Sequence, residues 1–182
     1  MEICFVSQED SQAILDIYAY YVENSVFTFE YDVPTIEEFT KRIENTTRKY
    51  PYIVAKEDNT IVGYAYASGY RARAAYQWGV ELSIYLNPKI QHQGIGTKLY
   101  SVLLNMLKEL GYFRAYACIT IPNPTSIAFH QKFNFKEIGV FHKCGYKHEQ
   151  WLDVIWLELN LQDGEPQPIR PIEMIKNKKI SI

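Results

Sequence analysis

The chain has 182 residues, of which 47% are hydrophobic and 22% are charged, and its formal net charge is −2. These proportions predict one globular domain and argue against a disordered chain. The near-neutral balance gives no broad attraction to nucleic acid or to an anionic membrane, so neither is expected as a partner.

The cysteines and the N-terminal segment bear on compartment. Cys4, Cys118 and Cys144 form no CxxC pair, and their number is odd. A disulfide framework or a metal site is therefore not expected, and reduced thiols in the cytoplasm are the natural interpretation. The first ten residues show no signal peptide, and no apolar stretch approaches the length of a membrane span.

The first half of the chain predicts one strand, two helices and three strands. Residues 2–6 are strand-like, and the apolar positions from Ala13 to Val22 recur at helical spacing. Pro34-Thr35, followed by two glutamates, opens a second helix. Strands are then predicted at 52–56, 61–68 and 76–86, with a tight turn after the first and a basic loop after the second.

The second half predicts a strand between two helices and then two strands. The helices are expected from Ile95 to Leu110, with Gly111 as the cap, and from Asn123 to about Phe133. Strands are predicted at 113–119, 136–141 and 150–161. The whole order indicates an α/β (α+β) fold with a mixed sheet. Residues 1–161 are expected to form the domain, and 162–182 a partly extended, loosely packed tail.

The segment Gln91-His92-Gln93-Gly94-Ile95-Gly96 lies between a predicted strand and a predicted helix. Unpaired N–H groups and the helix dipole favour an anion there, and glycine lets the backbone approach a phosphate closely. The Walker pattern and the dinucleotide GxGxxG pattern are both absent. Two glycines alone also fit a plain turn that begins a helix, so the loop by itself does not decide the ligand.

The residues around this loop bring a family resemblance. Gln91-x-x-Gly94-x-Gly96 resembles the (Gln/Arg)-x-x-Gly-x-(Gly/Ala) acetyl-CoA signature of the GNAT acetyltransferases. Further segments resemble, in the same order, the phosphinothricin acetyltransferases and their amino-acid acetylating relatives in that family. They include Thr28-Phe29-Glu30, Val62-Gly63-Tyr64-Ala65, Arg73-Ala74-Ala75-Tyr76, Glu81-Leu82-Ser83-Ile84-Tyr85, Pro122-Asn123, and Gly145-Tyr146-Lys147 with Trp151-x-Asp153-Val154.

The resemblance implies an architecture and a co-substrate. The GNAT fold has a mixed central sheet of about seven strands with flanking helices. Its middle strands, here those of Leu82–Leu86 and Ala115–Ile119, splay apart to admit the pantetheine arm. Acetyl-CoA as co-substrate, no metal ion and a homodimer are expected on the same ground.

Two residues are candidates for catalysis. Glu81 lies in an apolar, aromatic strand where burial would raise its pKa toward that of a useful base, and phosphinothricin acetyltransferases have a Glu here. A surface acid on an alternating strand is the alternative. His130 stands where many GNAT enzymes have a Tyr that protonates the leaving thiolate, and it could be an acid or assist the base. Simple packing of this histidine against the sheet is equally open.

The binding candidates fall into two groups. The donor to the thioester oxygen is expected to be a backbone N–H near Ser83–Tyr85. Asn123 and Ser126 either contact the pantetheine arm or cap their helix. The cofactor-binding candidates are Ser83, Ile84, Tyr85, Gln91, His92, Gln93, Gly94, Ile95, Gly96, Thr97, Asn123 and Ser126, and the acceptor candidates are Arg73, Tyr76, Phe29 and Glu30.

The leading hypothesis is an N-acetyltransferase that acts on a small amino-acid-like acceptor of the phosphinothricin or methionine sulfoximine/sulfone type. Its reaction would be direct attack in a ternary complex. The alternatives are the same chemistry on another amine, such as a polyamine, and a non-catalytic acyl-CoA-binding sensor. One departure from the relatives is Asn134, which replaces the glycine of Leu-Gly-Phe. Asparagine tolerates the left-handed conformation, so the turn is expected to persist.

Overall fold

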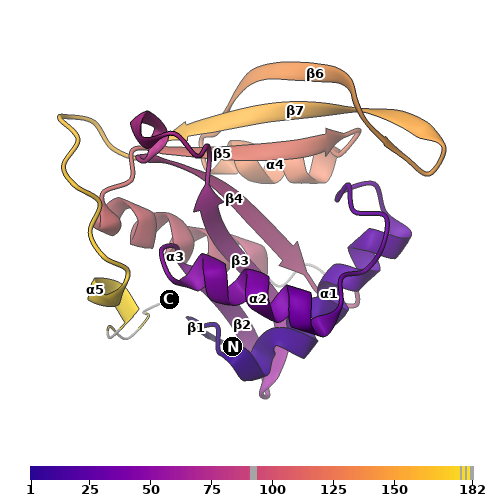
Figure 1. Ribbon diagram of the computed structural model, residues 1–182, viewed down its shortest axis with the longest axis horizontal. Helices are drawn as coiled ribbons and strands as arrows, with labels where there is room; N and C mark the ends of the chain where they lie inside the picture. Colours follow the sequence, from indigo (N-terminus) through magenta and orange to yellow (C-terminus); the bar gives the residue numbers. More distant parts are fainter. Residues whose placement is uncertain (91–93, 177, 179, 181–182) are drawn as a thin grey trace.

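The computed structural model of the chain describes residues 1–90, 94–176, 178 and 180. Its strands form one mixed seven-stranded sheet, as predicted for this fold class, and their order is β1-β2-β3-β4-β5-β7-β6 (Figure 1). The strands are β1 Glu2–Phe5, β2 Tyr52–Glu57, β3 Thr60–Gly69, β4 Gly79–Leu86, β5 Arg114–Ile121, β6 Lys136–Lys147 and β7 Gln150–Asn160. The helices are η1 Gln8–Asp10, α1 Ser11–Asn24, α2 Ile36–Thr47, η2 Ala74–Tyr76, α3 Ile95–Leu110, α4 Pro124–Lys132 and α5 Glu173–Lys176.

Local sequence signals set several of these boundaries. Helix α2 begins with a capping box in which the Thr35 hydroxyl accepts from the Glu38 N–H and the Glu38 carboxylate accepts from the Thr35 N–H. The β2–β3 turn has positive φ at both Asp58 and Asn59, the conformation of a two-residue hairpin turn. Asn134 also has a positive φ, 65°, which confirms that asparagine supports the turn after α4.

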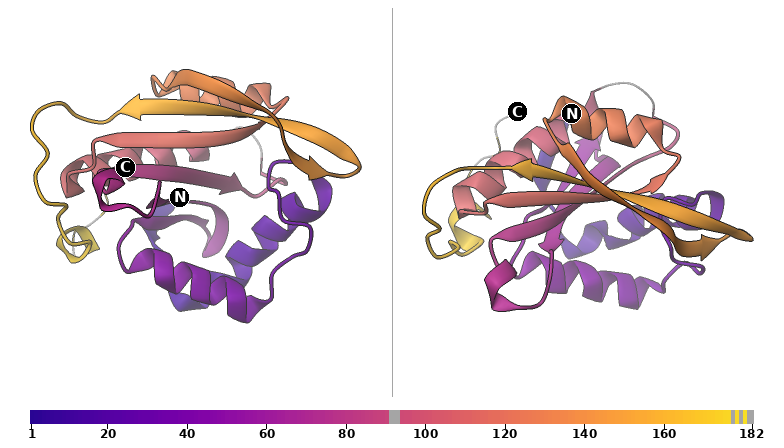
Figure 2. Two further views of the ribbon diagram at one scale, coloured as in Figure 1. Left: turned by 45° about the horizontal axis from the view of Figure 1, so that its top comes forward. Right: turned by 90° about the horizontal axis from the view of Figure 1, so that it is seen from above.

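The helices divide between the two faces of the sheet. Helices α1 and α2 pack on one face of the β1–β4 half, whereas α3 packs on the other, joined farther along the sheet by α4 (Figures 1 and 2). Since side chains alternate along a strand, β4 contributes to both faces. Leu82 packs in the core under α3, while Tyr85 packs beside α1.

The gap predicted in the middle of the sheet is present. Strands β4 and β5 run parallel and pair only at Gly79↔Arg114, Val80↔Ala115 and Glu81↔Tyr116. From there β4 keeps its pairing with β3, through Leu86, while β5 keeps its pairing with β7. Figure 1 shows the two strands diverging. The described residues of β4 beyond Glu81 therefore have no ladder partner on their β5 side.

Two predictions about element bounds need correction. Strand β4 begins at Gly79 rather than at residue 76, because Ala74–Tyr76 form a 3₁₀ turn and the Trp78 indole N–H donates to the Gln167 carbonyl, 2.8 Å away. Strand β6 continues to Lys147, so it forms a long hairpin with β7.

The C-terminal tail is not loosely packed. Ile172 and Ile175 are 2% and 3% exposed and belong to the core under α3. The last carbonyls of α3 have no partner within the helix. Arg170 donates to two of them: its backbone N–H binds the Leu110 carbonyl, and its guanidinium binds the Glu109 carbonyl. The boundary at residue 161 stays a prediction. Among the described residues, no helix has the length and apolar character needed to cross a membrane.

Candidate active site

The start of α3 supplies an anion-binding surface. Gly94 precedes the helix with φ 71°, and a Cβ built on it would lie within 4 Å of no atom of the described residues, so none of them crowds its backbone. The first main-chain bond of the helix runs from Lys98 back to Gly94. The N–H groups of Ile95, Gly96 and Thr97 are thus available to a ligand. Gln91, His92 and Gln93, which were also predicted to bind the cofactor, lie outside the described residues.

The second glycine of the motif has a packing role. Gly96 is buried, and a Cβ there would lie 3.4 Å from side-chain atoms of Leu86 and Phe129 and 3.6 Å from Ile84. A Cβ at these distances makes ordinary van der Waals contacts, so alanine would also fit, whereas a larger side chain would have to displace the first turn of α3 or its neighbours. Gly96 therefore keeps the helix start close to the gap in the sheet, while Gly94 leaves room for a ligand.

The predicted donors on β4 lie along this gap. Ile84 points into the core beneath α3, so it contributes packing on that side. Ser83 lies opposite Tyr66 of β3, and Tyr85 lies opposite Tyr64, on the face that carries α1 and α2. Backbone groups of this stretch that face β5 lack a strand partner, as the predicted oxyanion donor requires.

Glu81 lies where β4 and β5 begin to diverge. It pairs with Ser68 on one side and with Tyr116 on the other. Its side chain is half-buried, and its carboxylate forms no hydrogen bond or ion pair with another described residue. Burial raises the pKa of this carboxyl. A carboxylate that is desolvated and uncompensated is a suitable proton acceptor.

His130 lies on the other side of the sheet. Its ring is 4% exposed and makes edge contacts with Tyr100 and Phe135 in the core under α3. Nδ1 lies 2.8 Å from the Ser126 carbonyl oxygen, which can only accept, so Nδ1 carries the hydrogen. Burial lowers the pKa of the imidazole, and the bond to Ser126 opposes this only in part. The low pKa keeps the ring neutral. The Glu81 side chain lies on the opposite face of the sheet, because it alternates with Leu82, which packs under α3.

Asn123 and Ser126 take part in a helix cap. The Asn123 side-chain oxygen accepts from the Ser126 N–H at 3.1 Å, at the first turn of α4. The Ser126 carbonyl in turn fixes His130. The capping alternative is the one visible in the structure, and it orders the end of β5 that borders the gap.

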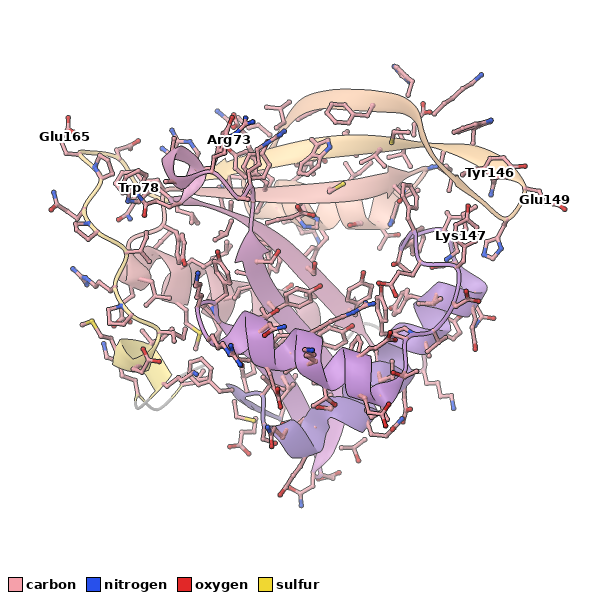
Figure 3. The ribbon with its side chains drawn as sticks, viewed as in Figure 1. Arg73, Trp78, Tyr146, Lys147, Glu149 and Glu165 are labelled. Carbon is pink, nitrogen blue, oxygen red and sulfur yellow. The ribbon has the colours of Figure 1, made fainter. Side chains whose placement is uncertain are left out.

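The loop after α1, residues 25–31, is held by the β6–β7 hairpin. Lys147 is 1% exposed, and its Nζ donates to the carbonyls of Val22 at 2.7 Å and Thr28 at 2.9 Å. Burial lowers the pKa of this ammonium, and the charge of Glu30 opposes the shift. The Tyr31 hydroxyl donates to the Tyr146 carbonyl on the same hairpin. Figure 3 shows Tyr146 and Lys147 at this end of the hairpin, above the loop that follows α1.

The other acceptor candidates lie elsewhere. Arg73 caps the 3₁₀ turn that contains Tyr76, and the Arg71 guanidinium lies 5.7 Å from the Tyr76 ring centroid. Figure 3 places Arg73 well apart from Lys147, toward the end of the molecule where β4 begins. The structure therefore brings Phe29 and Glu30 together at one end, and Arg73 and Tyr76 at the other.

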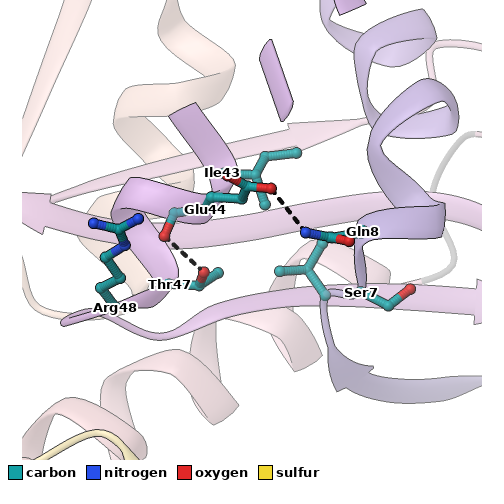
Figure 4. Close-up of a pocket in the computed structure, with 7 residues that line it drawn as sticks. Ser7, Gln8, Ile43, Glu44, Thr47 and Arg48 are labelled. Atoms are coloured by element: carbon teal, nitrogen blue, oxygen red, sulfur yellow. Dashed lines mark hydrogen bonds between the residues drawn. The ribbon is translucent and has the colours of Figure 1, made fainter. Parts of the chain in front are cut away.

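Two of the hollows in the described surface bear on where the site lies. The larger, about 350 Å³, lies between η1 and α2 and is lined by Val6, Ser7, Gln8, Ile43, Glu44, Thr47 and Arg48 (Figure 4). None of the predicted site residues lines it. The smaller, of about 120 Å³, is the tyrosine cavity, lined by Tyr18, Glu30, Phe39, Arg42, Ile43, Thr46, Tyr52, Tyr64 and Tyr66. It contains one predicted acceptor residue, Glu30.

No site role was predicted for Lys147, Arg42 or Tyr66. The signal for Lys147 was its place in the segment Gly145-Tyr146-Lys147, which resembles the relatives but does not by itself assign a role. Arg42 lies on an amphipathic helix, where a charged residue is ordinary. Tyr66 is one of fifteen tyrosines, so its position in a cavity could not be read from its residue type.

The described structure thus places a helix start, a gap between two parallel strands and a half-buried carboxylate around the middle of the sheet. A family model described as acetyltransferase (GNAT) domain matches residues 3–156. The phosphinothricin N-acetyltransferase of Streptomyces viridochromogenes is 32% identical over 96% of both chains. The chain therefore belongs to the GNAT acetyltransferase family and is an N-acetyltransferase.

Other relatives extend this comparison. A crystal structure of a phosphinothricin acetyltransferase from Sinorhizobium meliloti in complex with acetyl-CoA is 36% identical, with a TM-score of 0.87 over 91% of this chain and 92% of that one. The L-methionine sulfoximine/L-methionine sulfone acetyltransferase of Salmonella typhimurium is 28% identical over 90% of this chain and 96% of that protein. Within the part of the chain that the structure describes, no His, Cys, Asp or Glu cluster could hold a metal ion.

Proposed function

We propose that this enzyme transfers the acetyl group of acetyl-CoA to the amino group of a small amino-acid-like acceptor, by direct attack in a ternary complex. The observation that carries the proposal is Glu81. Its carboxylate is half-buried, has no partner among the described residues and borders the gap between β4 and β5. That combination suits a base that must take a proton from an ammonium group.

The co-substrate fits the residues that are present. The first turn of α3 and the uncrowded backbone of Gly94 suit the pyrophosphate, and the gap between β4 and β5 suits the pantetheine arm. The relative from Sinorhizobium meliloti holds acetyl-CoA. An unpaired N–H of the Ser83–Tyr85 stretch would then donate to the thioester oxygen.

In the proposed reaction Glu81 removes a proton from the ammonium group of the acceptor, directly or through one water molecule. The neutral nitrogen then attacks the thioester carbon, so that an N–C bond forms and the C–S bond breaks. The attacking nitrogen loses its second proton as the intermediate collapses, and the leaving thiolate takes up a proton, so that the products are a neutral amide and the CoA thiol. Since the buried imidazole of His130 is kept neutral, its proposed role as the proton donor requires transfer from a neutral ring. If His130 instead assists Glu81, or only packs against the sheet, its neutral ring need not give up a proton.

The acceptor is proposed to lie on the α1–α2 face, next to Glu81. Named relatives act on phosphinothricin and on methionine sulfoximine or sulfone, which are all amino acids with a polar end group. Arg73 and Tyr76 are proposed to contact the acceptor near the start of β4, and Phe29 and Glu30 to contact it from the loop after α1.

A homodimer in the cytoplasm is also proposed. The β6–β7 hairpin exposes Ile138, Phe141, Tyr146 and Trp151, each at least 46% accessible, and such a set is unusual on an unpartnered surface. All three cysteines are unpaired, in keeping with a reducing compartment. Light scattering at micromolar concentration would measure the mass, and a monomer would contradict the dimer.

The test of the function is release of free thiol from acetyl-CoA against a panel of acceptors. The panel contains phosphinothricin, methionine sulfone, methionine sulfoximine, common amino acids and polyamines. Release with the amino-acid analogues is expected, and Glu81→Gln should abolish most of it. Release with polyamines alone would overturn the proposed acceptor class, and binding of acetyl-CoA with no release for any amine would favour a sensor.

A further inference from the structure

The tyrosine cavity adjoins the proposed catalytic base. Tyr66, which lines it, lies opposite Ser83 across the β3–β4 ladder, and Ser83 is two residues from Glu81 on the same face of the strand. Burial is the main cause that raises the pKa of the Tyr66 hydroxyl. The charges of Glu81 and Glu30 raise this pKa further, while the hydrogen bond to Ser83 and the charge of Arg42 lower it. The Tyr66 hydroxyl therefore lies within electrostatic range of both Glu81 and the Glu30–Arg42 pair.

The spacing suits an amino acid with a short side chain. Two residues of strand advance about 6.6 Å, which separates the Glu81 level from the Tyr66–Ser83 level. An acceptor whose amino group meets Glu81 can therefore place the fourth or fifth atom of its side chain at the cavity. The cavity is small, with a volume of about 120 Å³. It has room for a compact end group of several non-hydrogen atoms.

The lining determines the chemistry of that end group. Phe39, Ile43 and the rings of Tyr18 and Tyr52 form the apolar part of the lining, which suits a methyl group. One face of Tyr18 is stacked on Phe39, and one face of Tyr52 is stacked on Tyr66. The hydroxyls of Tyr52 and Tyr64 donate to no other described residue, so they can serve an oxygen acceptor in the cavity. The cavity therefore fits a methyl group beside one or more strong hydrogen-bond acceptors.

The charges of the lining cancel. Glu30 and Arg42 are its only charged members, and they form an ion pair at the cavity. The guanidinium can still donate from its remaining N–H groups, but no net positive charge faces an incoming group. Glu81 adds a negative charge nearby. An anionic end group would meet two carboxylates and one guanidinium, which is unfavourable, whereas a neutral dipolar group meets only donors and one acceptor.

We infer that the tyrosine cavity is the subsite for the side-chain end of the acceptor, and that the Glu30–Arg42 pair makes it prefer a neutral methylsulfonyl or sulfoximidoyl group over an anionic methylphosphinate. The inference rests on the proposed function and adds to it the substrate subclass. It makes Glu30, Arg42 and Tyr66 residues that set specificity.

The decisive measurement is the ratio of kcat/KM for methionine sulfone to that for phosphinothricin. The wild type is expected to favour the sulfone by about tenfold or more. Glu30→Gln leaves the Arg42 charge uncompensated, so it should move the ratio about tenfold toward phosphinothricin. Arg42→Gln should lower kcat/KM for both. Methionine, which lacks the sulfonyl oxygens, should be a poorer acceptor than its sulfone. Glu44→Gln is the matched control on α2, because Glu44 lines the other hollow, and it should leave the ratio unchanged.

A calorimetric titration separates this inference from the proposed function. Methionine sulfone is titrated into the enzyme with CoA in place of acetyl-CoA, so that binding is seen without turnover. Binding that Arg42→Gln weakens about tenfold supports the subsite even if no acetyl transfer occurs, in which case only the proposed function fails. A wild type that binds no sulfone, or a ratio that Glu30→Gln leaves unchanged, would overturn the subsite.

Discussion

The ammonium group of Lys147 donates to the main-chain carbonyl of Thr28, 2.9 Å away, and this bond joins two segments separated by 119 positions. A second bond, to Val22, ends at the last part of α1. The buried cation thus fixes the loop that carries Phe29 and Glu30, two of the proposed acceptor contacts. Charged groups buried in this way are expected to be costly to remove, because their partners are left unpaired.

Lys147→Met tests this relationship. Loss of two charge-assisted bonds should lower the free energy of unfolding by about 2–3 kcal/mol. Since the loop would no longer be held, KM for the acceptor should rise about tenfold while KM for acetyl-CoA stays unchanged. Steady-state kinetics with each substrate varied would show this difference. Lys136→Met, at the exposed start of the same strand, is the control, and equal changes in both KM values would mean a general structural effect.

Glu81→Gln should separate catalysis from stability. Loss of the base is expected to reduce kcat by about 10²- to 10⁴-fold. The same change removes a half-buried carboxylate that has no partner among the described residues, so the melting temperature at pH 7 should rise or stay the same. Kinetics and thermal melts of one preparation provide both readouts. Exposed Glu137→Gln serves as the control, and full turnover by Glu81→Gln would remove this residue from the mechanism.

The pH dependence follows from the raised pKa of Glu81. Burial lifts it above the ordinary value of 4.5. As the pH falls through the raised pKa the base becomes protonated, so kcat/KM should decline on an acid limb that lies above pH 4.5. The sign for stability is the reverse. Protonation favours the folded state, so this stabilisation is complete below the ordinary pKa and is lost as the pH rises through the folded pKa. The residual activity of Glu81→Gln should lack that acid limb.

The sequence predicted what neighbouring residues determine. The hairpin turn at Asp58-Asn59, the cap at Gly111 and the turn at Asn134 all follow from residue types that tolerate positive φ, and the structure confirms them. The resemblance to the GNAT family located the gap between β4 and β5, which local patterns could not have done, since pairing between distant strands depends on the whole sheet.

Three features could not be predicted from local sequence because they depend on contacts between distant segments: the role of Lys147, the packing of the tail and the cavity at Tyr66. Lys147 looks like any strand lysine until the loop after α1 closes over it. The tail was expected to be loose because its composition is polar and proline-bearing, but Ile172 and Ile175 pack into the core that α3 shares with the sheet. The cavity at Tyr66 exists only once the β3–β4 register sets this residue opposite Ser83.

The tail should contribute measurably to stability. Ile175→Ala removes a side chain that is 3% exposed, so the free energy of unfolding should fall by about 2–4 kcal/mol. Met174→Ala changes the adjacent residue of α5, which is 50% exposed, and should cost less than about 0.5 kcal/mol. Urea unfolding of the two variants would compare them directly. Equal, small effects would mean that the tail contributes little to the folded domain.

Gly145 of β6 lies against the ring of Phe29. A Cβ on Gly145 would lie 2.1 Å from Cε2 of the Phe29 ring, so Gly145→Ala must displace that ring. Because Phe29 is a proposed acceptor contact, KM for the acceptor should rise several-fold, while the ring can move outward at little cost in stability. Gly139→Ala, where a Cβ meets nothing within 4 Å, is the control on the same strand. In a Phe29→Ala background the clash no longer exists, so adding Gly145→Ala should have no further effect on KM. Additive effects in this double-mutant cycle would show that the glycine acts through something other than Phe29.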